Sequence, residues 1–207
     1  MRAGGRPGGE REGKELSTHT LSVLVENKPG VLAHVAGMFS RRAFNISSLA
    51  VGPTEDERVS RMTIVVDGAS TPVEQVAKQL DKLIRVLKVV ELSEGAAVER
   101  ELALIKVRID PALRGELLEV ATVFHTKVVD MSPETIILEA TSSPGKLDSL
   151  LANLERYGTC ELVRTGRIAM SRGSATITDP GLAVTVTPPR SPRPSERPDL
   201  VDRPDLT

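Results

Sequence analysis

The order in which strand-like and helix-like patterns alternate is the feature that most constrains the fold of this chain. From residue 20 onward, segments of alternating apolar and polar residues, typical of half-buried strands, are separated by segments with apolar residues at helical spacing. The first half shows the order strand, helix, strand, strand, helix, strand. We predict strands at about 20–26, 45–52, 59–67 and 86–92, and helices at about 31–43 and from Pro72 onward.

The second half repeats this order, and the helix starts mark the repeat. Thr71 is an N-cap candidate, Pro72 fits the first helical position, and Glu74 completes a capping box. Ser143 and Pro144 occupy the same place in the second half. We predict further strands at about 102–109, 126–131, 135–141 and 160–170, and helices at 111–124, after an Asp110 cap, and from Pro144 onward.

Each half therefore predicts a split βαβ unit, in which two helices cover one face of a four-stranded antiparallel sheet. This is the ferredoxin-like arrangement, and two βαββαβ domains in tandem make the chain α+β. The duplication is one of topology, because the two halves share little sequence identity. We expect a disordered N-terminal extension, two domains joined near 93–100 and a disordered tail that holds seven of the fourteen prolines, with bounds 1–18, 19–93, 94–172 and 173–207.

Composition argues against nucleic-acid and membrane partners. Lys and Arg number 27 and Asp and Glu number 28, so no net basic field attracts nucleic acid or anionic lipid. The chain has three Phe, one Tyr and no Trp, too few for base-stacking platforms. The longest apolar runs are far shorter than a membrane span. The single cysteine and an N-terminus without an apolar signal segment predict a cytoplasmic protein.

The inventory of catalytic residues is poor. His19, His34 and His125 are scattered, without the clustered spacing that a metal site needs. Cys160 has no neighbouring His or Asp in sequence, and we interpret it as a buried strand residue. Phosphate loops, nucleophile elbows and paired-carboxylate motifs do not stand out. We predict that the chain has no catalytic residue, no metal site and no intrinsic enzymatic activity.

The turn at residues 26–32, between the first strand and the first helix, is the candidate binding site. Pro29 and Gly30 form a turn pair, and the N–H groups of Gly30 and Val31 then lie at the positive end of a helix, where a carboxylate is favoured. Asn27 ends the first strand and Asn45 begins the second, and we expect both at one end of the sheet. Their amides can accept from an ammonium group and donate to a carboxylate.

Hydrogen-bond donors for a carboxylate, next to acceptors for an ammonium group, are what a site for a free α-amino acid requires. Val31, Leu32 and Ile46 are placed to form the floor of an apolar side-chain pocket. The alternative for each of these five side chains is structural. The asparagines are common turn and cap residues, and the apolar residues commonly pack in a core.

Residues 21–32, LSVLVENKPGVL, resemble the opening of an ACT domain, a ferredoxin-like module that senses amino acids. Six further segments together resemble the small, regulatory subunit of acetolactate synthase (acetohydroxyacid synthase). These segments are 39–46, 60–64, 79–83, 98–102, 145–148 and 171–173. The resemblance covers about 19–173, and the N-terminal extension and the Pro-rich tail lie outside it.

This resemblance implies a non-catalytic subunit that activates a large, catalytic subunit. That partner uses thiamine diphosphate, FAD and magnesium to condense pyruvate with pyruvate or 2-oxobutyrate in branched-chain amino acid biosynthesis, while the small subunit binds no cofactor. The small subunit makes its partner sensitive to end products, chiefly valine, in a pocket between ACT domains of two chains, so a homodimer is implied. The family's ligand positions correspond to Asn27, Gly30, Val31, Leu32, Asn45 and Ile46.

Other interpretations remain open from the sequence. A free-standing ACT-type sensor would bind an amino acid but regulate a different enzyme or a transcription factor. An enzyme with a ferredoxin-like fold would turn over substrate alone. Valine, isoleucine and leucine are not ranked by the residues, because one methylene in an apolar pocket is worth only about 1–3 kcal/mol. We expect the ACT half to contact the catalytic subunit.

Overall fold

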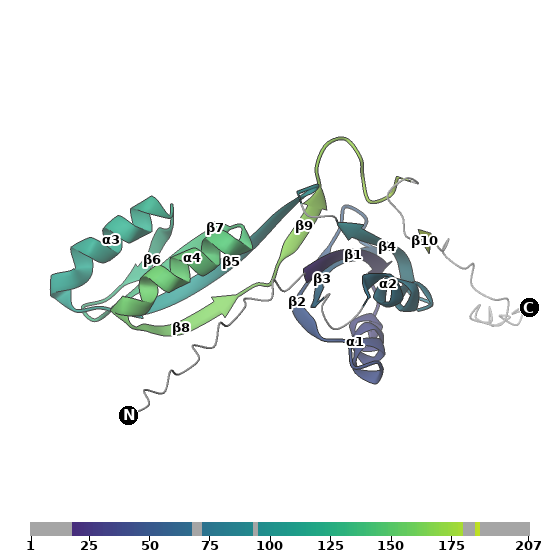
Figure 1. Cartoon of the computed structure of the whole chain (residues 1–207), viewed down its shortest axis with the longest axis horizontal. Coiled ribbons are helices and arrows are strands. Elements are labelled where there is room, and N and C mark those ends of the chain that lie inside the picture. Colours follow the sequence, from purple (N-terminus) through teal and green to yellow (C-terminus); the bar gives the residue numbers. More distant parts are fainter. Residues whose placement is uncertain (1–17, 68–71, 93–94, 180–184, 187–207) are drawn as a thin grey trace, which may run out of the picture.

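The computed structural model describes residues 18–67, 72–92, 95–179 and 185–186, with no side chains described for the last two. It contains two antiparallel sheets, each with helices on one face, arranged as two domains side by side (Figure 1). The predicted α+β class, with two ferredoxin-like units in tandem, is confirmed.

In the first domain the strands lie in the order β4-β1-β3-β2, as a split βαβ unit requires. Alternate apolar residues of β1 point toward the helices, and the largest side chain of this core, Phe39, packs edge-on against Phe44. A short strand, β10, adds to the outer edge of β4. The elements are β1 (Thr18–Glu26), α1 (Val31–Arg41), β2 (Ile46–Pro53), β3 (Val59–Asp67), α2 (Val73–Asp81), β4 (Val86–Leu92) and β10 (Thr185–Val186).

The second domain has the same strand order, here β6-β7-β5-β8. Its separate core lies between the sheet and the helices, and includes Ile105, Leu117, Leu138 and Leu150. The elements are β5 (Ala97–Arg108), η1 (Pro111–Leu113), α3 (Arg114–Val123), β6 (Lys127–Met131), β7 (Thr135–Ser142), α4 (Pro144–Leu154), η2 (Glu155–Tyr157) and β8 (Thr159–Arg164).

The predicted helix starts are mostly confirmed. The Asp110 side chain accepts a hydrogen bond from the Ala112 amide at 2.9 Å, so it caps the 3₁₀ turn that leads into α3. Ser143 and Pro144 are the N-cap and first residue of α4. Pro72 stands one position earlier than predicted, at the N-cap of α2, and Thr71 lies outside the described residues.

The strand expected over 160–170 is broken into two. β8 ends at Arg164, and a separate strand, β9 (Ile168–Ser171), pairs with the start of β5, which begins five residues before the predicted 102. The paired segments of β5 and β9 form a two-stranded ribbon that extends from the second domain to the first (Figure 1). There β9 contacts β1 and β4 on the face of the sheet away from α1 and α2.

A polar cluster attaches this ribbon to the first domain. The Glu99 carboxylate accepts from Thr20 Oγ1 at 2.8 Å and pairs with Arg167 at 3.3 Å. The Arg167 backbone N–H donates to Ser48 Oγ at 2.8 Å. Because these contacts join β1 and β2 to β5 and to the residue just before β9, the domains have a defined relative orientation. Arg164, which precedes this cluster, donates hydrogen bonds to the Glu101 carboxylate, and these bonds raise the pKa of its guanidinium.

Gly166 lies close to the backbone of β2. Its φ is +82°, and a Cβ atom there would lie 2.9 Å from the Leu49 carbonyl oxygen and 3.1 Å from Ser48 Oγ. A side chain would therefore require the ribbon to move away from β2.

The segment that follows β9 makes one contact with a buried residue of the first domain. We expected disorder from residue 173, and residues 173–179 are among those described. The Asp179 carbonyl accepts from the buried Lys88 ammonium at 2.7 Å, and a buried cation requires such a hydrogen-bond partner. The bounds of the tail stay a prediction.

Replacing Gly166 tests whether the close approach fixes the domain arrangement. We expect Gly166→Ala to lower the free energy of unfolding by roughly 2–4 kcal/mol, since it adds a clash to an unfavourable φ. Gly173→Ala is the matched control, because Gly173 has φ +79° and open space at the Cβ position, so that variant should lose only roughly 1 kcal/mol. Equal urea midpoints for the two variants would contradict this account.

Candidate functional site

The turn between β1 and α1 has the backbone geometry that its sequence predicts. Gly30 is the N-cap of α1 with φ +83°, a left-handed conformation that glycine adopts without strain. It is exposed, and no atom lies within 4 Å of the place of a Cβ. The Val31 amide donates to the Lys28 carbonyl at 3.4 Å, a long bond, whereas the Gly30 and Leu32 amides donate to no backbone carbonyl of the described residues. The available donors are thus Gly30 and Leu32 rather than Gly30 and Val31.

Neighbouring turns hold this turn in place. Asn27 donates its side-chain amide to the Glu57 carbonyl at 2.8 Å, and its backbone N–H to the Arg58 carbonyl at 2.7 Å. Arg85 donates to the Pro29 carbonyl at 3.2 Å. The amide nitrogen of Asn27 therefore has a structural role, while its Oδ1 accepts from no described group. The sequence interpretation missed Arg85, whose role depends on the placement of the turn before β4.

The β2–β3 turn that holds Asn27 is itself ordered by an ion pair. The Arg58 side chain donates to both oxygens of Asp56, at 2.9 and 2.7 Å, and the Arg58 backbone N–H donates to Oδ1 at 3.0 Å. The side-chain hydrogen bonds from Arg58 lower the pKa of Asp56 from 3.8 to about 2. The charged stretch 54–58 is the sequence signal for this turn.

Asn27 and Asn45 lie at opposite ends of the sheet, so the prediction that they share one end is wrong. Glu26, next to Asn27, pairs with Val59, whereas Ile46, next to Asn45, pairs with Val66. These partners are seven residues apart on β3, which corresponds to about 23 Å. The physical reason is that α1 returns the chain to the other end of the sheet, so β1 and β2 run in the same direction.

The remaining predicted site residues divide between core and surface. Val31 is buried in the first core, and Ile46 is half-buried against it. Leu32 is 46% exposed, and Asn45 is exposed just before β2. Asn45 and Ile46 lie at the start of β2, the outermost strand on its side of the described sheet, whereas Val31 and Leu32 lie at the start of α1, at the other end of the sheet.

The structure also places the histidine and cysteine side chains considered as candidates for chemistry. Within the described ranges, no group of three or more His, Cys, Asp or Glu side chains is arranged to hold a metal ion. His19 contacts Glu91 through Nδ1 at 2.7 Å. Cys160 is exposed on the edge strand β8 rather than buried as we expected, because the core of this domain does not extend over that edge. In the part of the chain that the structure describes, no helix is long and apolar enough to cross a membrane.

Arg58 offers a direct check of the turn. In wild type the Asp56 carboxyl should titrate near pH 2, and in Arg58→Ala its pKa should rise toward 3.8, as followed by NMR of the carboxyl carbon. A pKa that is lowered in the folded state stabilises the fold above about pH 3.8, and that contribution is lost as the pH falls through about 2. If the Asp56 carboxyl of Arg58→Ala titrates at the same pH as in wild type, the ion pair does not order this turn in solution.

Two family models match the sequence, one in each domain. The model described as the AHAS small subunit-like ACT domain matches residues 21–88. The model described as the small subunit of acetolactate synthase matches residues 100–173.

Individual proteins match over both domains. The acetolactate synthase small subunit of Mycolicibacterium smegmatis is 57% identical over 156 residues, which cover 75% of this chain and 92% of that protein. A probable acetolactate synthase small subunit of Archaeoglobus fulgidus is 53% identical over 156 residues, covering 75% of this chain and 98% of that protein. The crystal structure of the acetolactate synthase small subunit of Thermotoga maritima superposes with a TM-score of 0.71 at 40% identity, over 77% of this chain and 99% of that one.

Proposed function

The chain belongs to the family of acetolactate synthase small subunits, and from this we propose that it is a non-catalytic regulatory subunit. In this proposal it activates a cytoplasmic catalytic subunit that carries thiamine diphosphate, FAD and magnesium, and makes it sensitive to valine. The observation that carries the proposal is the collinear match of two family models to both domains, over 21–88 and 100–173.

We propose further that the effector binds between two copies of the chain. The β1–α1 turn and the start of β2 are too far apart to share one small ligand within a single copy. If two copies pair along their β2 edges about a two-fold axis, their β2 strands run antiparallel. Asn45 of one copy then lies at the end of the sheet that carries Gly30 of the other. The unpaired edge of β2 supports this arrangement.

The chemistry of the two half-sites suits a branched-chain amino acid. The amides of Gly30 and Leu32, at the positive end of α1, are donors for the ligand carboxylate. The Oδ1 atoms of Asn27 and Asn45 are acceptors for the ammonium group. Leu32 and Ile46 are the exposed and half-buried apolar side chains for the ligand's aliphatic group.

A path for regulation starts at the same edge. Ser48 lies two residues beyond Ile46 on β2 and accepts the Arg167 N–H, so a shift of this edge is transmitted to the ribbon and the second domain. An effector must favour one arrangement of the assembly over another to change activity. A ligand that joins two β2 edges can supply such a difference, with a coupling of about 1–3 kcal/mol in typical cases.

The activity of the pair tests the proposed function. Acetolactate formation by the purified cognate catalytic subunit should rise to saturation as this chain is added, and should fall when valine is added. The catalytic subunit alone, with and without valine, is the control. No change in rate, with amino-acid binding retained, would indicate the free-standing sensor instead.

Substitution of Gly30 tests the effector site. Gly30→Asp should raise the valine concentration for half-inhibition at least tenfold while activation remains, because its carboxylate repels that of the ligand. Gly30→Asn is the control, since asparagine has the same shape without the charge and tolerates a positive φ. An unchanged valine response in Gly30→Asp would exclude this turn from the site.

Mixed dimers then decide whether the site is shared between chains. Gly30→Asp and Asn45→Ala should each lose valine sensitivity alone. In a mixed dimer of the two variants, one of the two sites combines both substitutions and the other contains neither. We therefore expect partial recovery of inhibition on mixing, whereas sites confined to single chains would show no recovery.

A further inference from the structure

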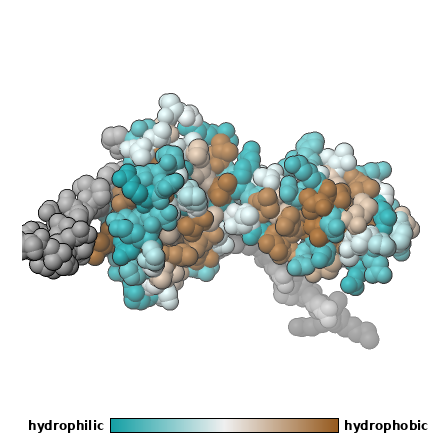
Figure 2. All heavy atoms as spheres, turned by 180° about the vertical axis from the view of Figure 1, so that it is seen from behind, coloured by the Kyte–Doolittle hydropathy of each residue, from teal (hydrophilic) through white to brown (hydrophobic). Residues whose placement is uncertain are grey.

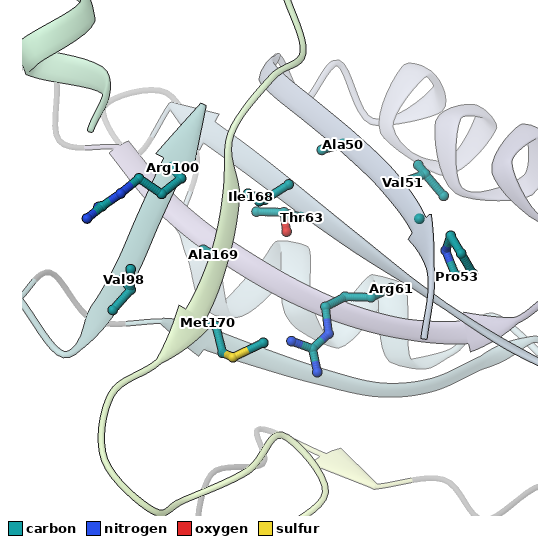
Figure 3. A pocket seen from close by; sticks show the side chains of 11 residues that line it. Ala50, Val51, Pro53, Arg61, Thr63, Val98, Arg100, Ile168, Ala169 and Met170 are labelled. Carbon is teal, nitrogen blue, oxygen red and sulfur yellow. The ribbon is translucent and has the colours of Figure 1, made fainter. Parts of the chain in front are cut away.

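A trough lies beside the ribbon on the helix-free face of the first domain. It encloses about 330 Å³ between β9 and the β2–β3 hairpin. Figure 2, seen from behind, shows apolar side chains exposed on both domains. Figure 3 shows the trough from close by, with Ala50, Arg61, Thr63, Ile168 and Met170 among its lining residues.

Small residues form its floor and large apolar residues form its wall. Ala50 pairs with Thr63, and Gly52 with Arg61, so these four residues share the helix-free face. In Figure 3 the Ile168 and Met170 side chains extend from β9 toward Thr63 and Arg61. These two side chains are 57% and 61% exposed. At Ala50, Gly52 and Thr63 the floor has no bulky side chain, so another backbone can approach closely there, and the wall offers apolar area to bury.

Arg61 and Arg100 are among the residues that line the trough, and Figure 3 shows Arg61 beside Met170, whereas the Arg100 guanidinium points away from Ile168. Neither Arg61 nor Arg100 has a carboxylate within 4.0 Å among the described residues, and Arg100 donates only to the Glu99 carbonyl oxygen. By contrast, Arg164 and Arg167 on the same connection are both ion-paired. Apolar surface next to unpaired guanidinium groups is complementary to a segment that combines apolar side chains with a carboxylate.

We propose that this trough docks such a segment, apolar and with at least one carboxylate, of the catalytic subunit. This inference rests on the proposed regulatory function. It goes beyond that function by assigning the contact to one surface, formed jointly by the first domain and the ribbon. Ile168 and Met170 are the central apolar contacts, and Arg61 receives the carboxylate.

The described fold disfavours two other occupants. Among the described residues, the segment after β9 lies beside Arg61 and Met170 at 173–178, and β10 pairs with β4 at the opposite edge of the sheet. A second copy paired along β2 extends the sheet in its own plane and does not cover the trough. That pairing instead brings the troughs of two copies together on one face, which enlarges the surface available to a partner.

Surface variants of the full chain test the docking site. We expect Ile168→Asp and Arg61→Glu each to weaken binding to the purified catalytic subunit at least tenfold, measured by titration of activation and by direct binding. Val123→Asp, at the end of α3 and 71% exposed, is the matched control and should bind as wild type does. Thermal melting and valine binding by calorimetry check that each variant is folded.

The outcomes separate this inference from the function on which it rests. If wild type fails to bind or activate the catalytic subunit, the proposed function itself is wrong. If wild type activates and both folded trough variants activate at the same concentration, the docking site is overturned while the function stands. A change in the oligomeric mass of the variants without the catalytic subunit would assign the trough to a second copy and also overturn the proposal.

Discussion

The packing of the β5–β9 ribbon on the first sheet is the constraint on which the arrangement of this molecule depends. A ferredoxin-like unit covers only one face of its sheet with helices, so the other face needs a partner or remains in water. In the first domain the ribbon and the segment after it cover that face, where Thr20, Ser22 and Lys88 are buried. Polar contacts among Thr20, Glu99 and Arg167 satisfy groups that burial would otherwise leave unpaired.

The second domain shows what happens without such a cover. Its helix-free face carries Leu104 and Val163, which pair across β5 and β8 and are 38% and 55% exposed. No described element lies over them. The two domains therefore share one topology but differ in what covers the helix-free face of the sheet. The difference arises because the β5–β9 ribbon extends over the first domain. The ribbon gives the first domain both its trough and its direct contact with the edge strand β2, and our proposals for partner docking and for effector coupling depend on it.

The comparison of Asn27 with Asn45 shows where pattern-based reasoning failed. The sequence correctly predicts a turn with glycine at a positive φ before a helix, because these are local properties of residues 26–32, although the described amides without a backbone partner include Gly30 and Leu32 rather than Val31. Placing Asn45 beside that turn needed the direction of β2, which the intervening helix reverses. Because Asn27 and Asn45 lie at opposite ends of the sheet, they cannot contact one small ligand within a single chain. In our proposal the effector site therefore combines residues of two copies.

The sequence by itself determined the element order, the helix starts and the two cores, because alternation, helical spacing and cap residues act over a few positions. Family membership was likewise readable from collinear segments. Only the tertiary structure decided the break between β8 and β9, the close approach of Gly166 to Leu49 and the paired or unpaired state of each arginine. Those features depend on contacts between residues more than sixty positions apart, and a local pattern carries no information about which distant atoms will meet.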